Sequence, residues 1–473
     1  MPKPLLLALA VLGLAGCTLG PPHVRPEVAL PERFDQAGTT PAEPAPAAAA
    51  VWRAFEDPVL EALIAQTLAA NTTIAQASAR FEEARALSGL SRFARLPTLT
   101  AAADAHRSNP SAEDPFLPPG QPTTDTFRAG FDAVWEIDLF GALRNPSRAQ
   151  ARRTEAEAAQ LAAVRLSMVA ETAQAYFALR GAQRREALAR ENLAAADEVL
   201  RIIHRLAAAG RLDAVDAARA KAQRDVLAAA LPQRETERIA HENRLAVLTA
   251  QPVAAVRVRV GEAPAEFPAL PALVATGTPE QWLKRRPDIA AAERQLAAAR
   301  NDVGTEIAQY FPRLSLQGGF GWTGQQADAL GTAGAERWQW GPVLSWRFLD
   351  AGRVRQHVRA AEARADGAVA RYRETVLRAL EETENALAGF RSSQQAAVEL
   401  GRAATAAREA ARLSRLRFRA GADDPLTLLQ TEQSRIELED AAVQAEAARA
   451  TALAALYKAL GGDFAEAAPP TGG

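Results

Sequence analysis

The sequence predicts an α+β membrane protein with internally duplicated long α-helical hairpins and four transmembrane β-strands per chain. Three observations carry this prediction: a duplication that fills most of the chain, long proline-free stretches with helical periodicity, and shorter segments in which apolar and polar residues alternate. Both patterns occur in the same order in each half of the chain. We therefore expect each repeat to contribute strands to one region and long helices to another.

The duplication is visible in landmark residues that recur at a constant spacing. Landmarks up to residue 99 recur 215 residues later, and landmarks from residue 135 onward recur 211 residues later. The difference places a four-residue length change in a loop between these two positions. We therefore expect two structural repeats, residues 51–265 and 266–461. The pairs are Ile74 with Ile289, Arg85 with Arg300, Pro97 with Pro312, Leu99 with Leu314, Trp135 with Trp346, Gly141 with Gly352, Arg144 with Arg355, Gly210 with Gly421 and Asp213 with Asp424.

Each repeat is expected to end in two long helices. Between residues 354 and 390, apolar residues recur every three or four positions, which is the helical period. No proline occurs within 352–421, and the first copy shows the same stretch over 147–210. A helix of that length reaches roughly 100 Å at 1.5 Å per residue. A glycine at the end of each stretch predicts the turn into the second helix.

Three segments alternate apolar and polar residues: 126–139, 313–323 and 337–348. A fourth strand at 98–107 has a weaker pattern and is placed by its repeat partner. These lengths fit a tilted membrane strand of about 9–11 residues. A soluble sheet with one buried face is the alternative, but aromatic residues on one face and charges on the other are typical of outer-membrane barrels. The expected lipid-facing aromatic residues are Phe127, Phe131, Trp135, Phe320, Trp322, Trp338, Trp340, Trp346 and Phe348.

Four strands per chain predict an oligomer. Membrane barrels of single chains begin at eight strands, and an open sheet edge in lipid leaves backbone groups without hydrogen bonds. Two, three or four copies would supply eight, twelve or sixteen strands. The physics of the residues does not choose among these numbers.

The first residues predict export and a lipid anchor. An apolar run over 5–14 is too short to span a bilayer and is typical of a signal peptide, expected over 1–16. Small residues precede Cys17, the only cysteine, as in a bacterial lipobox. We expect lipidation at Cys17, an extended tether over 17–50 rich in proline and alanine, and a flexible tail over 462–473. The alternative is an ordinary signal peptide with an incidental cysteine.

Composition and residue spacing argue against several function classes. A formal net charge of -1 disfavours a nucleic-acid partner. A lone cysteine leaves no intramolecular disulfide or thiolate cluster, and the five histidines lack metal-ligand spacing. No nucleophile and base are arranged for catalysis. We therefore expect no enzyme activity, no metal and no cofactor.

A series of motifs, in this order and duplicated, resembles the TolC family of outer-membrane efflux channels, in its OprM/NodT-like lipoprotein branch. The resemblance covers nearly all of residues 14–461. The motifs that carry it lie at 14–17, 52–58, 71–85, 135–141, 286–289, 310–312, 348–352 and 417–421.

The resemblance implies a homotrimer with a 12-stranded β-barrel in the outer-membrane lipid and a trimeric α-barrel tunnel in the periplasm. It also implies a periplasmic adaptor protein and an inner-membrane pump, usually of the resistance-nodulation-division type. The channel would be a passive exit duct for drugs or other small molecules. A protein-secretion duct of the same fold is one alternative, and a helical structural lipoprotein without a pore is another of a different class.

The resemblance further implies that the helix turns at Gly210 and Gly421 form a closed periplasmic tip. The residues expected to act in this gate are Asp213, Asp216, Arg417, Phe418, Arg419, Asp423, Asp424 and Leu426.

This chain departs from the family at two positions of the tip. The family often has acidic residues six and nine positions after the second glycine, where Thr427 and Gln430 stand here. A different closure is therefore expected. Either an aspartate just after Gly421 pairs with Arg419, or an apolar ring forms near Leu426.

Overall fold

The computed structural model describes residues 19–37 and 55–461, apart from residues 112, 114, 117, 119, 262, 264, 265, 269 and 271–276. The expected signal peptide, Cys17, the tether beyond residue 37 and the C-terminal tail lie outside the described residues. The chain divides into two compact units, each described by itself below. The sheet unit comprises Met1–Pro26, Arg80–Glu157 and Ala291–Tyr372, and the hairpin unit comprises Glu27–Ala79, Ala158–Ala290 and Arg373–Gly473.

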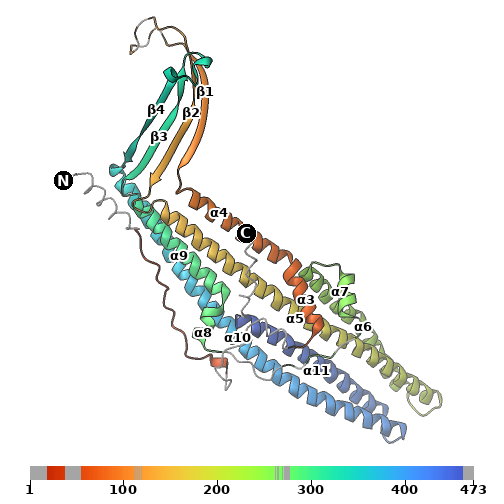
Figure 1. The fold of residues 1–473 in the computed structure, drawn as a ribbon. Coiled ribbons are helices and arrows are strands. Elements are labelled where there is room, and N and C mark those ends of the chain that lie inside the picture. Colours follow the sequence, from red (N-terminus) through yellow and green to blue (C-terminus); the bar gives the residue numbers. More distant parts are fainter. Residues whose placement is uncertain are drawn as a thin grey trace. The chain divides into compact units, whose positions relative to one another are not determined.

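The sheet unit contains one four-stranded antiparallel sheet in the order β1-β2-β3-β4 (Figure 1). Its strands are β1 (Thr98–Ser108), β2 (Thr124–Ile137), β3 (Arg313–Gly324) and β4 (Glu336–Ser345). Each repeat supplies one β-hairpin, and β2 pairs with β3 to join the two repeats. In the part of the chain that the structure describes, no further strand pairs with the sheet edges on β1 and β4.

Two strands end earlier than the alternating pattern predicts. β2 ends at Ile137 because the carboxylate of Asp138 accepts hydrogen bonds from the backbone N–H of Gly141 and of Arg144, both at 2.7 Å, and so begins the next helix. β4 ends at Ser345. The strand predicted to continue to Phe348 was therefore too long: Trp346 follows β4, and Phe348 begins the 3₁₀ turn η4 (Phe348–Asp350).

Helices flank the sheet in sequence in the same way in both repeats. α4 (Thr72–Phe93) leads into β1, and α9 (Pro287–Ala308) leads into β3. α5 (Arg144–Ala208) follows β2, and α10 (Ala351–Arg419) follows β4. α5 has 65 residues and α10 has 69, which confirms the two long helices. Short 3₁₀ turns η2 (Ala327–Ala329) and η3 (Ala333–Ala335) connect β3 to β4.

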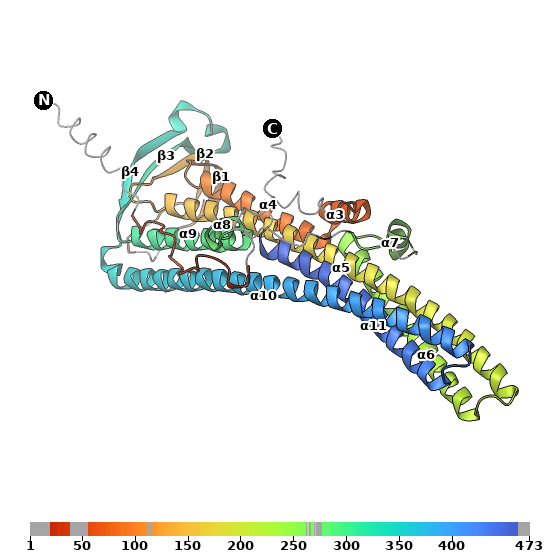
Figure 2. The same cartoon turned by 90° about the horizontal axis from the view of Figure 1, so that it is seen from below.

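The hairpin unit is built from the far parts of these long helices and their return helices. α6 (Ala214–Thr249) pairs with α5, and α11 (Pro425–Ala459) pairs with α10. The two hairpins run side by side in both views (Figures 1 and 2). Both repeats thus contribute one hairpin to this unit and two strands to the other.

A compact core surrounds the base of the hairpins. Short helices α3 (Pro58–Ala70), α7 (Val253–Val260) and α8 (Pro279–Arg285) contribute to it, and η1 (Asp35–Ala37) lies in the N-terminal segment. The ring of Phe55 packs against that of Phe177 in a tilted arrangement, with ring centroids 5.2 Å apart. The fully buried side chains of this region include Leu60, Leu63, Phe177, Leu245, Leu248, Leu453 and Trp282. No helix among the described residues has an apolar stretch that meets the requirement for crossing a membrane.

Candidate functional site

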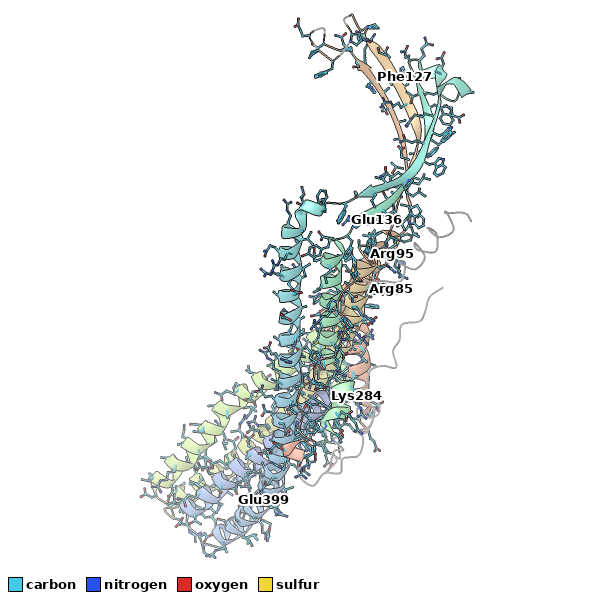
Figure 3. The ribbon with its side chains drawn as sticks, turned by 90° about the vertical axis from the view of Figure 1, so that its left-hand side faces the viewer. Arg85, Arg95, Phe127, Glu136, Lys284 and Glu399 are labelled. Carbon is cyan, nitrogen blue, oxygen red and sulfur yellow. The ribbon has the colours of Figure 1, made fainter. Side chains whose placement is uncertain are left out.

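One face of the sheet is apolar and exposed. The strand register aligns Phe131 with Phe320 and Phe320 with Trp338, so the aromatic residues of three strands lie side by side. Trp338 is 68% exposed and Trp340 is 76% exposed. Figure 3 shows Phe127 near one end of β2, and this residue belongs to the same face. Seven of the nine predicted lipid-facing aromatic residues therefore share one face of the sheet, on β2, β3 and β4. The other two, Trp346 and Phe348, follow β4.

The opposite face carries the charges. Asp104 on β1 lies across from Arg128 on β2, and Asp132 lies across from Gly319. Arg337 and Gln339 occupy the same face of β4, between the tryptophans in sequence. A sheet with aromatic residues outward and full charges on the other side matches the wall of a water-filled membrane barrel.

A band of tryptophans marks the helix-side end of the sheet. The indole N–H of Trp135 donates to the carbonyl of Arg95 at 3.1 Å, and that of Trp346 donates to the carbonyl of Tyr310 at 3.0 Å. Both indoles are otherwise well exposed. Tryptophan with a satisfied N–H and an exposed ring suits the boundary between water and lipid. Figure 3 places Arg95 and Glu136 together near this end.

The two helix turns of the hairpin unit have the same construction. Gly210 and Gly421 adopt φ values of +69° and +73°, in the left-handed region that favours glycine. Asp213 begins α6 by accepting a hydrogen bond from Val215 N–H at 3.1 Å. Asp424 begins α11 by accepting one from Thr427 N–H at 2.7 Å. These backbone hydrogen bonds lower the pKa of Asp424. Both aspartates thus have structural partners within the chain.

The other predicted tip residues separate into three groups. Phe418 is buried against Ile203, Leu428 and Leu429, whereas Leu426 is 40% exposed. The guanidinium of Arg417 pairs with the carboxylate of Asp423 at 3.0 Å, so Asp423 does not pair with Arg419 inside one chain. In the part of the chain that the structure describes, the side chains of Asp216 and Arg419 form no ion pair.

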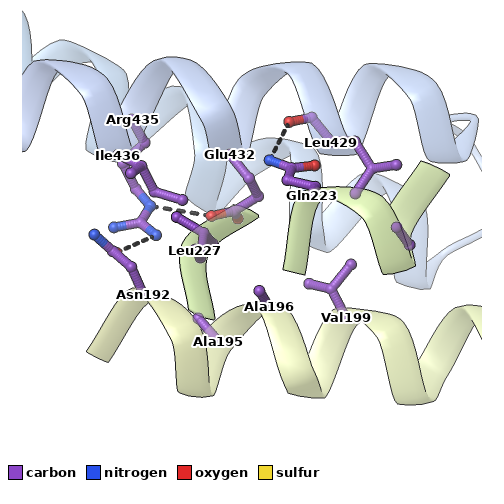
Figure 4. Close-up of a pocket in the computed structure, with 11 residues that line it drawn as sticks. Asn192, Ala195, Ala196, Val199, Gln223, Leu227, Leu429, Glu432, Arg435 and Ile436 are labelled. Carbon is purple, nitrogen blue, oxygen red and sulfur yellow. Dashed lines mark hydrogen bonds and ion pairs between the residues drawn. The ribbon is translucent and has the colours of Figure 1, made fainter. Parts of the chain in front are cut away.

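Sequence reasoning missed a buried polar cluster that joins the two hairpins (Figure 4). Arg435 on α11 donates to Glu432 at 3.0 Å and to the side-chain oxygen of Asn192 on α5 at 2.9 Å. Arg415 on α10 also donates to Glu432, at 2.7 Å through one of its nitrogens. Hydrogen bonding to Glu432 raises the pKa of Arg415. Only the i, i+3 spacing of Glu432 and Arg435 signalled a pair, and nothing in the sequence signalled burial.

A second buried charge lies in the core of the hairpin unit. Arg286 donates to Asp288 at 2.8 Å, to Glu382 at 2.6 Å and to the carbonyl of Ala459 at 2.9 Å. Lys458 also donates to Glu382, at 2.8 Å. Burial opposes ionisation of Glu382, but Lys458 and Arg286 outweigh it and lower its pKa. Within the described ranges, no cluster of three or more potential metal-binding side chains occurs.

The family model for outer membrane efflux proteins matches residues 63–251 and 278–462. The chain belongs to the outer membrane efflux protein family. Outer membrane protein OprJ of Pseudomonas aeruginosa is 31% identical over 462 residues, covering 97% of this chain and 95% of OprJ. The pyoverdine export outer membrane protein OpmQ of the same species is 31% identical, covering 87% of each chain. The solved outer-membrane channel OprN has a TM-score of 0.88 at 36% identity, covering 94% of this chain and 99% of OprN.

These matches confirm the resemblance to TolC-family channels, the predicted fold class and the predicted function. This efflux channel protein acts in the outer membrane and is a channel component, not an enzyme. The non-channel structural lipoprotein is thereby ruled out.

Proposed function

We propose that three copies of this efflux protein form one 12-stranded β-barrel and one α-helical tunnel. The two unpaired edges of the sheet support this assembly, because each edge needs a partner strand in lipid. Three copies supply β4 of one chain to β1 of the next around a closed ring. The apolar face then meets lipid and the charged face lines a water-filled passage.

The trimer serves as the passive exit duct of a tripartite efflux system. An inner-membrane pump of the resistance-nodulation-division type delivers drugs or other small molecules through a periplasmic adaptor protein. The name of OpmQ gives pyoverdine as its exported compound, which favours small-molecule efflux over the alternative of a protein-secretion duct. Energy comes from the pump, because the chain belongs to a family of channel proteins.

A groove between α6 and α11 is the proposed contact for the adaptor. It has a volume of about 560 Å³ and lies beside the helix turns. Val226 and Leu426 line it and are 68% and 40% exposed, so it offers apolar surface that a partner helix can cover.

Lipidation at Cys17 anchors each chain in the outer membrane. Support comes from the lipobox-like residues before Cys17 and from the absence of any other cysteine in the sequence. Several acyl chains on one cysteine hold a protein firmly at a membrane, whereas a single chain does not.

The gate at the tip depends on charges contributed between chains. Among the described residues, Asp216 and Arg419 have no ion-pair partner, so both are available to a neighbouring copy. Apolar contacts around Phe418 hold each turn in shape. Closure therefore combines a fixed apolar turn with ion pairs between chains.

Neutralising both Asp216 and Arg419 should raise the single-channel conductance in planar lipid bilayers, because it removes contacts that hold the tip closed. The matched control neutralises Glu399 and Arg402, an exposed pair on α10 with the same charges at 3.0 Å. Equal conductance in both double variants would remove Asp216 and Arg419 from the gate.

A further inference from the structure

The residues that follow Cys17 are seated in the sheet unit. The side-chain amide of Asn145 donates a hydrogen bond to the backbone carbonyl of Leu19 at 2.9 Å. Asn145 is the second residue of α5 and is only 3% exposed. Because this buried amide donates its hydrogen bond to the carbonyl of Leu19, it fixes the position of the chain two residues after the cysteine.

Two glycines allow this close approach. A Cβ on Gly304 of α9 would lie 2.6 Å from the carbonyl oxygen of Leu19 and 2.7 Å from the Nδ2 of Asn145. A Cβ on Gly20 would lie 2.8 Å from the Cα of Gly304, and Gly20 adopts a φ of +139°. Neither position has room for a larger residue without displacing the segment.

The duplication supplies an internal comparison for this site. The 215-residue spacing relates Gly89 on α4 to Gly304, and the 211-residue spacing relates Gln356 on α10 to Asn145. A Cβ on Gly89 would meet no atom within 4 Å, and Gln356 is exposed. Within one chain, therefore, the N-terminal segment fills the position at Gly304 and does not fill the counterpart at Gly89.

Further contacts continue along α9. Arg25 lies 3.5 Å from the carboxylate of Glu293 and donates to the hydroxyl of Tyr372 at 2.9 Å. The imidazole of His23 lies 3.7 Å from Glu293. The segment from residue 19 to residue 25 is thus held at both of its ends.

This site lies where the sheet meets its helices. Asn145 follows the end of β2, and Gly304 precedes the start of β3, at the same end of the strands as Trp135 and Trp346. Cys17 precedes Leu19 by two residues, so an extended chain separates them by at most about 7 Å.

We propose that Asn145 and Gly304 form a docking site for the residues that follow Cys17, and that this site fixes the acyl chains beside the helix-side ends of the β-strands. The anchor then enters the membrane at one place on each chain instead of anywhere that a free tether could reach. This inference rests on the lipidation of Cys17 proposed above.

The test places the photoreactive residue benzoylphenylalanine at Thr18 in the full-length, processed protein held in phospholipid nanodiscs. Mass spectrometry then maps the cross-linked residues. We expect cross-links confined to the first turn of α5 and the last turns of α9. Gly304→Ala should abolish this pattern, because its Cβ displaces Leu19, whereas the matched variant Gly89→Ala should keep it.

Gly20→Ala provides a second variant that leaves the docking site itself unchanged, and it should also abolish the pattern. Cross-links that are scattered in the unaltered protein, or that survive in both Gly304→Ala and Gly20→Ala, would overturn the docking site. The mass of the N-terminal peptide reports acylation separately. An unacylated Cys17 overturns the lipid anchor and the role of the site in placing it, whatever the cross-links show.

Discussion

At the scale of single residues, charged side chains in the hairpin unit have buried partners that the sequence pattern does not reveal. Glu381 and Glu382 form an acidic pair within a charged helix, which predicts two solvated side chains. In the structure, the carboxylate of Glu382 instead accepts hydrogen bonds from Arg286 and Lys458. These partners come from segments far away in the sequence, so local periodicity carries no signal for them.

Glu382→Gln should destabilise the protein at pH 7 and have a smaller effect near pH 3. The pKa of Glu382 is lowered in the folded protein, so its stabilisation is present above its unfolded pKa and is lost as the pH falls through its folded pKa. Because the side chain is 35% exposed, the expected cost is on the order of 1 kcal/mol after solvent screening. Thermal unfolding at both pH values measures it.

Lys284→Met is the control for this experiment. Lys284 forms an exposed pair with Glu280 at 2.9 Å, so its removal should shift the midpoint little at either pH. A destabilisation by Glu382→Gln that is equal at both pH values would contradict the assigned charge interaction.

At the scale of elements, the alternation of residues predicted the sheet well. The strands predicted at 313–323 and 126–139 agree with the structure to within a few residues. The weak strand at 98–107 could also be predicted, because its partner in the second repeat has a clear pattern. The errors are at the strand ends near Leu139 and Phe348, where local hydrogen bonding to Asp138 and the 3₁₀ turn after β4 overrule the alternation.

Trp340→Arg should reduce the amount of assembled channel in the outer membrane, because it places a charge on the face of β4 that we propose to contact lipid. Such a charge costs about 2–4 kcal/mol near the middle of a bilayer. Gln339→Arg changes the adjacent residue, on the water-filled side, and should assemble normally. Immunoblots of outer-membrane fractions compare the two. The reverse order of effects would mean that the sheet faces are assigned the wrong way round.

The candidate site was less predictable than the elements that carry it. Glycine turns follow from local backbone rules, and Gly210 and Gly421 do adopt positive φ values between the paired helices. Asp424 was predicted as a gate residue, and in the structure its carboxylate begins α11. The pairing of Asp423 with Arg417, and the burial of Phe418, depend on how two helices approach each other. Sequence periodicity does not specify that approach.

At the scale of the whole molecule, the duplication explains how one chain supplies a sheet and a pair of hairpins. Each compact unit takes segments from both repeats, because β2 of the first repeat pairs with β3 of the second. Within one chain, the N-terminal segment breaks this symmetry, because it fills the position at Gly304 and not the counterpart at Gly89. The unpaired edges on β1 and β4 are the feature that one chain leaves incomplete.

Native mass spectrometry of the complex released from the outer membrane in mild detergent tests the proposed assembly most directly. Each chain contributes four strands, and the proposed trimer would close a 12-stranded barrel. We predict a single species with three times the mass of the acylated chain that begins at Cys17. A complex of one, two or four chains would contradict the account.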